Sequence, residues 1–248
     1  YAIDSGSKEL LLTSQDNGAF GADTGSSLEN LLTELSHLDG EFRLRVGMLN
    51  PMLVAGRSHE MAKAWGDART YKFIHLPIQS GSQKILDSMV RDHTLEEFWE
   101  VVNVFKYYYP EMMIITDIIT GFPGETDEDH RKTIGLLNEL SPDLVNVTRF
   151  SPRKGTPASR YKRINGRIVK KRSRELTILR KKLGAKSFRR FVGRKTSVLT
   201  VENQKRGSTL CRDDNYRPII LTEELPLGEF YDVEIIDSGY GFMTAVLV

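Results

Sequence analysis

Cysteine is the residue that this sequence most clearly lacks, since Cys211 is the only one among 248 residues. A single thiol excludes an internal disulfide, and it cannot hold an iron–sulfur cluster, which needs three or four thiolates. We therefore expect Cys211 to be a small buried residue. Long apolar runs are also missing, because none approaches the roughly 20 residues that a membrane-spanning helix needs. We expect no membrane partner and a cytoplasmic location.

Acidic residues are nearly absent from one long segment. Between Arg153 and Lys195 there are 18 lysines and arginines against one acid, Glu175, whereas the rest of the chain has a net charge of −15. A short charged run is often only a solvated face. A run this long and one-sided favours a polyanionic partner, because phosphate contacts dominate non-specific nucleic-acid affinity. RNA is favoured over a membrane surface, because the segment has no broad apolar face with bulky aromatics.

From residue 9 to about 150, short apolar runs alternate with helical periodicity, which predicts βα units and a parallel sheet. The expected strands are 9–13, 43–47, 73–77, 113–119 and 144–148. Apolar residues recur at helical spacing over 28–38 and 95–105, and we assign these stripes to core packing. The expected fold class is therefore α/β, with a partial (β/α) barrel.

After residue 156 the pattern changes. We expect a loop over 157–166, a long basic helix over about 169–191 with a narrow seam of Leu176, Leu179 and Leu183, and short β-rich runs from 194 onward. The expected strands are 196–202, 218–221, 231–236 and 242–248, with turns near 205–207, 213–215, 227–228 and 238–239. This size and turn spacing predict a small antiparallel barrel comparable to oligonucleotide-binding barrels.

Two motifs carry the most information, namely HLPIQSGS at 75–82 and TDIITGFPGE at 116–125. Each is an apolar run that ends in small and polar residues before a helix, as at the strand ends of a parallel barrel that face a ligand. Glycine would let a bound molecule approach the backbone closely. Thr126 and Asp129 form a capping-box pattern that opens the next helix. Two ordinary strand-to-helix turns are the alternative interpretation.

These motifs resemble those of radical S-adenosylmethionine (radical SAM) enzymes, and more narrowly those of tRNA methylthiotransferases. Three further segments agree with that family: LTSQDNGAFGAD at 12–23, LRVGMLNP at 44–51 and FSPRKGTPA at 150–158. The motifs TSQD and VGMLNP resemble those of the archaeal and eukaryotic branch of the family. The resemblance implies a partial radical-SAM-type barrel at 1–156, a basic connecting helical segment at 157–192 and a TRAM-like RNA-binding β domain at 193–248.

The resemblance also implies cofactors and a substrate. The family holds one 4Fe–4S cluster with a CxxxCxxC loop and a second with three cysteines in an N-terminal domain. Because Cys211 cannot replace these ligands, we expect a C-terminal fragment that ligates neither cluster and is inactive alone. In the full-length protein the resemblance implies S-adenosylmethionine, two 4Fe–4S clusters, and tRNA as the partner. The implied reaction is 2-methylthiolation of threonylcarbamoyladenosine beside the anticodon.

Position at the strand ends, together with the resemblance, suggests cofactor-binding residues. They are Ser14, Gln15, Gln79, Ser80, Arg91, Asp117, Gly121, Phe122, Pro123 and Asn146. Among them, Ser14 and Gln15 suit the amino and carboxylate groups of a bound amino acid, and Gln79 and Ser80 suit a ribose. Arg91 suits the cofactor carboxylate. Helix capping is the alternative role of Ser80, and His75 is expected to be a structural histidine.

A second group of residues is expected to contact RNA. Its members are Arg153, Lys170, Lys171, Arg172, Arg174, Lys205, Arg206, Tyr216 and Arg217. Tyr216 lies beside cationic residues, which favours stacking on a base. Arg153 suits either a cofactor or an RNA phosphate. No catalytic residue and no metal ligand is assigned.

Three other functions fit parts of the sequence. They are a methylthiotransferase acting on a ribosomal-protein aspartate, a non-catalytic RNA-binding protein on a barrel scaffold, and a metal-free phosphate-binding barrel enzyme. The basic segment and the TSQD wording disfavour the first. A CxxxCxxC motif upstream of Tyr1 would separate the radical enzyme from the other two.

Overall fold

The strands of the first part of the chain are parallel, as the sequence predicts. The computed structural model describes residues 1–204 and 207–248. Within them, the first five strands are β1 (Glu9–Leu12), β2 (Arg43–Val46), β3 (Phe73–His75), β4 (Met113–Thr120) and β5 (Leu144–Arg149). β1 pairs with β2, and β4 pairs with both β3 and β5. Single bridges, Leu44 to Thr70 and Met48 to His75, join the two sets.

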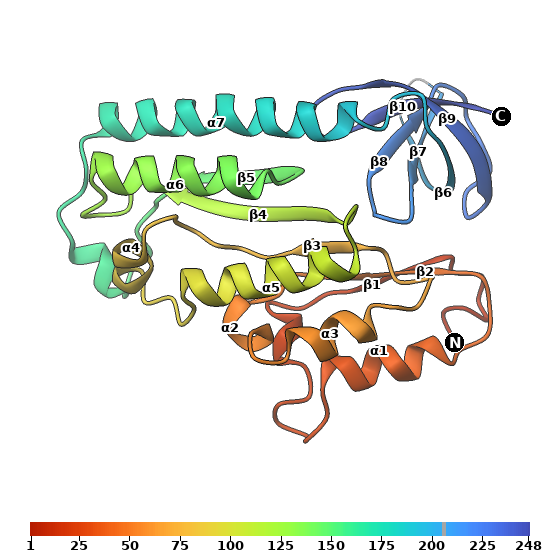
Figure 1. Cartoon of the computed structure of the whole chain (residues 1–248), viewed down its shortest axis with the longest axis horizontal. Coiled ribbons are helices and arrows are strands. Elements are labelled where there is room, and N and C mark those ends of the chain that lie inside the picture. The colour runs from red at the N-terminus through yellow and green to blue at the C-terminus, as the bar shows by residue number, and fades with distance from the viewer. Residues whose placement is uncertain (205–206) are drawn as a thin grey trace.

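Helices follow the strands and pack on them to form the body of the molecule (Figure 1). They are α1 (Leu28–Ser36), α2 (Pro51–Val54), α3 (Ser58–Ala64), α4 (Gln83–Ser88), α5 (Leu95–Tyr108) and α6 (Asp127–Leu140), with a 3-10 turn, η1 (Asn17–Ala19). The predicted capping box at Thr126 and Asp129 opens α6. Most of the predicted stripes are core, because Leu28, Leu32 and Phe105 are at most 1% exposed. Leu38 is the exception at 43% exposure, since α1 ends before it at Ser36.

A 24-residue helix, α7 (Gly166–Arg189), connects the two parts of the molecule. It begins after the 3-10 turn η2 (Pro157–Arg160), and the Asn165 side chain caps it by accepting a hydrogen bond from the amide of Arg167. The predicted apolar seam is confirmed, because Leu176 and Leu183 are buried in the core of the body. α7 lies beside α6 and β5 and reaches the second part at its far end (Figure 1).

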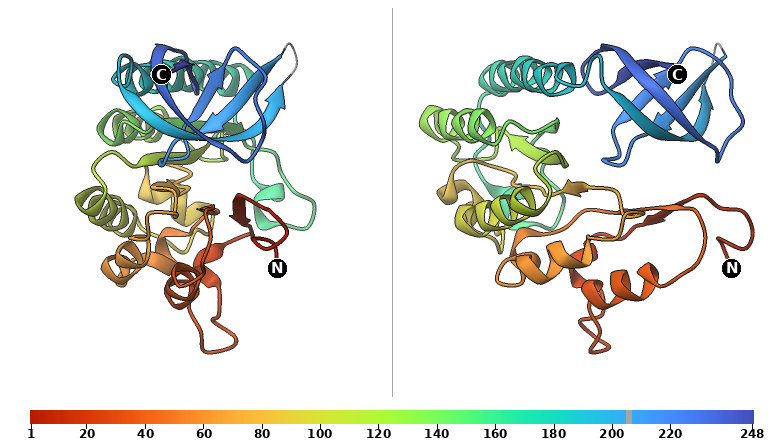
Figure 2. Two further views of the ribbon diagram at one scale, coloured as in Figure 1. Left: turned by 90° about the vertical axis from the view of Figure 1, so that its right-hand side faces the viewer. Right: turned by 45° about the vertical axis from the view of Figure 1, so that its right-hand side comes forward.

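The second part is a closed five-stranded barrel (Figure 2). Its strands are β6 (Lys195–Gln204), β7 (Ser208–Arg212), β8 (Pro218–Leu221), β9 (Phe230–Ser238) and β10 (Met243–Leu247). The pairings are antiparallel except for the parallel pairing of β10 with β8. The expected fold class is thus confirmed. β7 was not predicted, because its few apolar residues lie between two turns, and the predicted turn at 205–207 includes residues outside the described ranges.

The small barrel packs against the beginnings of β3 and β4. Phe73 and Met113, the first residues of these strands, share one buried cluster with Phe188 of α7 and Ile219 of β8. The carboxyl ends of the parallel strands therefore lie at the opposite end of the body from the small barrel (Figure 1). This arrangement separates the candidate ligand site from the small barrel by most of the length of α7.

Candidate functional site at the carboxyl ends of the strands

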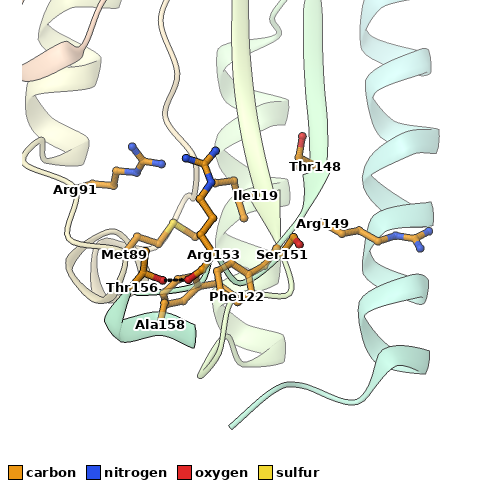
Figure 3. A pocket seen from close by; sticks show the side chains of 11 residues that line it. Met89, Arg91, Ile119, Phe122, Thr148, Arg149, Ser151, Arg153, Thr156 and Ala158 are labelled. Atoms are coloured by element: carbon orange, nitrogen blue, oxygen red, sulfur yellow. Dashed lines mark hydrogen bonds between the residues drawn. The ribbon is translucent and has the colours of Figure 1, made fainter. Parts of the chain in front are cut away.

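A cavity of about 360 Å³ lies at the carboxyl ends of β4 and β5 (Figure 3). It is lined by Met89, Arg91, Ile119, Phe122, Thr148, Arg149, Phe150, Ser151, Arg153, Thr156 and Ala158. Phe122 and Phe150 meet edge to face, with ring centroids 4.9 Å apart. The side chains of Arg91 and Arg153 come from the segments that follow α4 and β5, whereas the Arg149 side chain extends away toward α7 (Figure 3). We call this space the aromatic cavity.

A second cavity, of about 270 Å³, lies at the ends of the first three strands. Gln15, Gln79, Arg91 and His93 line it, so Arg91 borders both cavities. Gln79 has a positive φ of 69°, which non-glycine residues rarely adopt and which is often found at functional sites. The backbone amide of Gln79 donates a hydrogen bond to the backbone carbonyl of Asp117 at 2.8 Å, which fixes Gln79 beside β4. We call this space the polar cavity.

Ser14 lies apart from its predicted partner Gln15. It lines a third cavity, of about 520 Å³, around η1 and the start of α1. Asp16 borders both this third cavity and the polar cavity. Its carboxylate accepts hydrogen bonds from the backbone amides of Gly18 and Asn50. Asp16 therefore organises the loop, and only Gln15 of the predicted pair borders the polar cavity.

Three polar side chains meet on the neighbouring strands β3, β4 and β5. Nε2 of His75 lies 3.1 Å from both carboxylate oxygens of Asp117, and the Asn146 side-chain amide donates to Asp117 at 2.8 Å. Burial raises the pKa of Asp117, but the hydrogen bond and charge of His75, together with the Asn146 bond, bring it below its ordinary value. The predicted residues Asp117 and Asn146 are therefore brought together, with His75 as the residue that orients them.

Two of the three glycines in the motifs, Gly81 and Gly121, do not leave room for a bound molecule, which corrects the expectation for them. A Cβ at Gly81 would lie 2.6 Å from the backbone of Lys132 and Thr133 in α6. A Cβ at Gly121, whose φ is +79°, would lie 2.6 Å from the side chain of Val169 in α7. These glycines permit close packing of helices on the strand ends.

Ser80 is also not available to a ribose, so that expectation is corrected. It is 1% exposed, and its hydroxyl oxygen accepts a hydrogen bond from the amide of Ser82 at 3.2 Å. Ser82 in turn donates to Asp129 of α6 at 2.7 Å. Pro123 is buried and does not line the aromatic cavity, whereas its neighbour Phe122 does. The turn after β3 is therefore a structural connection to α6.

Arg172, predicted to contact RNA, is instead buried at 4% exposure. Its guanidinium forms ion pairs of 2.7 Å with both Glu125 and Asp127, which follow β4. Glu125 also accepts a hydrogen bond from the amide of Gly121 at 2.9 Å. The sequence could not reveal this role, because Glu125 and Asp127 precede Arg172 by 47 and 45 residues.

Lys170, Lys171 and Arg174 are exposed on α7, as expected of RNA contacts. Further exposed cations continue along the same helix: Arg167, Lys181, Lys182, Lys186 and Arg189. Lys171 lies 4.0 Å from Glu175, the only acid of the segment. α7 therefore presents a continuous cationic surface between the strand ends and the small barrel.

The predicted RNA contacts of the small barrel require a correction. Arg217 is 1% exposed and pairs with Asp213 at 3.0 Å. The Tyr216 ring packs against the rings of Tyr71 and Phe73, each with a centroid distance of 5.0 Å. Both residues hold the small barrel to the body, so neither presents a free face to a base. Lys205 and Arg206 lie outside the described residues.

Sequence reasoning missed His93 and Met89 as cavity residues. His93 is 3% exposed, its Nε2 lies 3.3 Å from the carbonyl of Ile78, and its Nδ1 has no hydrogen-bond partner among the residues described. Burial lowers the pKa of His93, which favours the neutral ring. The available signal was its position directly before the helix cap Thr94, near the predicted residue Arg91.

A family comparison identifies the class to which this site belongs. Residues 2–137 match the model of the radical SAM superfamily, and the chain belongs to that superfamily. Coproporphyrinogen III oxidase from Escherichia coli, described as a radical SAM enzyme, has a similar fold with a TM-score of 0.54 at 17% identity. That similarity covers 72% of this chain and 41% of the oxidase.

The sequence relatives belong to the branch that the motifs resemble. The chain is 44% identical, over 99% of its length, to a probable threonylcarbamoyladenosine tRNA methylthiotransferase of Archaeoglobus fulgidus. It is 34% identical, over 95% of its length, to the threonylcarbamoyladenosine tRNA methylthiotransferase of Homo sapiens. The chain spans 58% of the archaeal relative and 41% of the human one. The predicted resemblance is confirmed.

The described residues do not fit a four-iron cluster, although they do fit S-adenosylmethionine. Cys211 is buried in the small barrel, and burial raises the pKa of its thiol to about 12, which opposes a thiolate. Within residues 1–204 and 207–248, no group of three or more histidine, cysteine, aspartate or glutamate side chains could hold a metal ion. In contrast, Gln15, Gln79 and Arg91 supply donors around the polar cavity that suit an amino acid and a ribose.

In the same described ranges, no helix is long and apolar enough to cross a membrane.

Proposed function

We propose that this chain belongs to a tRNA methylthiotransferase that converts threonylcarbamoyladenosine beside the anticodon to its 2-methylthio form. The observation that carries this proposal is the aromatic cavity, which opens beside the segment that leads into the cationic surface of α7. The names of the sequence relatives support the substrate. Because the chain spans 58% of the archaeal relative, the complete reaction is assigned to a full-length enzyme whose cluster ligands lie outside these 248 residues.

In this proposal the residues of the polar cavity bind S-adenosylmethionine. When bound, this cofactor supplies the radical and methyl chemistry of the family. Gln15 and Gln79 offer hydrogen bonds to its polar groups, and Arg91 offers a charge for its carboxylate. His75 and Asn146 keep the pKa of Asp117 below its ordinary value, which favours its charged form on β4. Buried apolar residues such as Phe122 exclude water from the site.

The RNA would lie along α7 in this proposal. A helix of 24 residues is about 36 Å long, at roughly 1.5 Å per residue. Its exposed cations are therefore spread over several phosphate spacings of an RNA backbone. The surface begins at the aromatic cavity, through Arg153, and ends at the small barrel. Such a surface gives salt-dependent attraction that is independent of sequence.

We also propose that the division into three parts, 1–156, 157–192 and 193–248, describes the working units of the chain. The positions of the elements support it. β5 ends at Arg149, α7 covers 166–189, and β6 begins at Lys195.

The binding of tRNA that carries threonylcarbamoyladenosine, measured at several salt concentrations, tests this proposal. Changing Lys170, Lys171 and Arg174 together to serine should weaken binding and lower the salt slope by about three, at roughly 0.9 per lost phosphate contact. Lys63→Ser, at an exposed site on α3 away from α7, is the control and should change neither. Equal affinity and slope in the triple variant would contradict the proposed RNA path.

A further inference from the structure

Val90 has a backbone conformation that valine rarely adopts. Its φ is 55°, in the left-handed region, where a β-branched residue is a genuine outlier. The residue lies just beyond α4, and the backbone amides of Val90 and Arg91 donate to the carbonyls of Asp87 and Leu86, each at 3.0 Å. Glycine is the usual residue at this place after a helix, because it has no Cβ. A valine here therefore lowers the stability of the fold.

The other left-handed residues have a local reason for their conformation, whereas Val90 has none. Among the residues that the structure describes, three further non-glycine residues have a positive φ. Gln79 forms a backbone bridge to β4, and the Ser141 hydroxyl donates to the carbonyl of Asn138 at 2.9 Å. The Tyr216 ring is packed between the body and the small barrel. The Val90 side chain, in contrast, is 75% exposed and belongs to neither buried cluster.

Val90 lies beside the candidate site but outside its cavities. Its neighbour Met89 lines the aromatic cavity and its neighbour Arg91 borders both cavities, whereas Val90 lines neither. Ala158, in the segment that leads to α7, lines the same cavity as Met89. An RNA that follows α7 to the site would therefore reach Val90 at the end of its path. Both cavities remain with the cofactor.

We propose that Val90 is an apolar wedge, which contacts the base next to the substrate adenosine when that adenosine leaves the stack of the anticodon loop. The inference rests on the proposed function, because a base has to leave its stack to enter an enclosed site. Inserted apolar side chains separate stacked bases in other nucleic-acid complexes. A β-branched side chain is stiff, so little rotamer freedom is lost on contact. Strain of this kind is found at functional sites.

The charges beside Val90 favour a base over a phosphate. Asp87 and Asp92 are exposed on either side of it in the sequence. Carboxylates repel a phosphate, whereas the face of a base carries no net charge. A protein segment from the rest of a full-length enzyme is the competing occupant, and it would leave RNA binding by the 248-residue chain independent of Val90.

Binding of an anticodon stem-loop RNA to the 248-residue chain tests the inference. The RNA carries threonylcarbamoyladenosine with 2-aminopurine beside it, a base whose fluorescence rises when it loses its stacking neighbour. Val90→Gly should raise the melting temperature by about 2–4 °C, because the strain is lost. It should weaken binding about tenfold, the size expected for one lost base contact, and reduce the rise in fluorescence. Val90→Asn, which tolerates the same backbone, should weaken binding similarly, and Val90→Ile should keep it.

Ser141→Gly is the matched control, because it also replaces a left-handed residue after a helix, at the end of α6 far from the site. It should change neither affinity nor fluorescence. Native affinity in Val90→Gly, or a fall in its melting temperature, would overturn the wedge and leave the proposed tRNA function standing. Failure of the stem-loop to bind the native chain would overturn both. The binding of S-adenosylmethionine should be unchanged in Val90→Gly, and a matching loss there would show that Val90 acts by placing Arg91 and would overturn the wedge.

Discussion

The guanidinium of Arg172 donates hydrogen bonds to both the backbone carbonyl and the carboxylate of Glu125, at 2.9 and 2.7 Å. Arg172 lies in the first third of α7, and Glu125 ends the GFPGE turn after β4. The contact therefore ties the helix proposed to hold RNA to the turn that borders the candidate ligand site. Both residues are at most 6% exposed, so the pair is shielded from solvent.

Loss of this ion pair should destabilise the fold. Arg172→Ala leaves the Glu125 carboxylate buried without its partner, and breaking a buried pair in this way costs about 3–5 kcal/mol. Urea denaturation followed by circular dichroism measures the free energy of unfolding. Arg174→Ala, two residues away and exposed, should change it by less than about 0.5 kcal/mol. A similar effect of both substitutions would show that the pair has no special role.

The Asp117 carboxylate should make stability depend on pH in the acid range. Its pKa in the folded state lies below its ordinary value, so its contribution is complete above the unfolded pKa of about 3.9. This contribution is lost as the pH falls through the lower, folded-state pKa. The difference in unfolding free energy between the native chain and Asp117→Asn should therefore shrink between about pH 5 and pH 2. A constant difference across that interval would exclude this linkage.

A methyl group at Gly121 should be costly because two effects combine there. The residue has a φ of +79°, and a Cβ would lie 2.6 Å from Val169. A left-handed conformation costs an L-residue about 1–2 kcal/mol, and overpacking adds about 1–3 kcal/mol. Gly124→Ala is the control, because its φ is +86° but no atom lies within 4 Å of its Cβ position. Val169→Ala should recover part of the Gly121→Ala loss, and an additive double variant would contradict the contact.

Tyr216→Ala should lower stability more than it lowers RNA affinity. The ring is packed between the body and the small barrel, against Tyr71 and Phe73, and truncation of a packed aromatic costs about 3 kcal/mol or more. The measurements are thermal unfolding and stem-loop binding at a temperature where the variant is folded. A large loss of binding by the folded variant would restore the base-stacking role.

Much of the fold was predictable because its apolar patterns are local. The runs at 113–119 and 144–148 are long and rich in β-branched residues, and they became β4 and β5 within one residue at each end. β7 was missed, since only Thr209 and Cys211 are buried, the first of them is polar, and the apolar Leu210 points to the other face. Chain order, together with the family resemblance, placed Gln79, Arg91 and Phe122 near the site, because the carboxyl ends of parallel strands share one edge.

The roles of individual charges were harder to predict. Arg172 and Lys171 are neighbours in one basic run, yet only Arg172 faces Glu125 and is buried. Arg217 is likewise neutralised by Asp213 and is not at the surface. Whether an arginine meets an acid or water depends on the packing of distant elements, which a single sequence does not record. The same holds for Gly121, whose neighbour Val169 is 48 residues away in sequence.

Because α7 is continuous, it fixes both the distance and the rotation about the helix axis between the two ends of the molecule. Arg172 is anchored near one end and Phe188 is buried in the small-barrel cluster at the other, with unbroken helix between them. Inserting one residue between these anchors would advance the helix by about 1.5 Å and rotate it by about 100°. The small barrel would then lose its packing contact with β3 and β4, or Arg172 would lose its ion pair with Glu125. An insertion of seven residues, about two full turns, would roughly preserve the orientation of both ends, but it would lengthen the distance between them by about 10 Å.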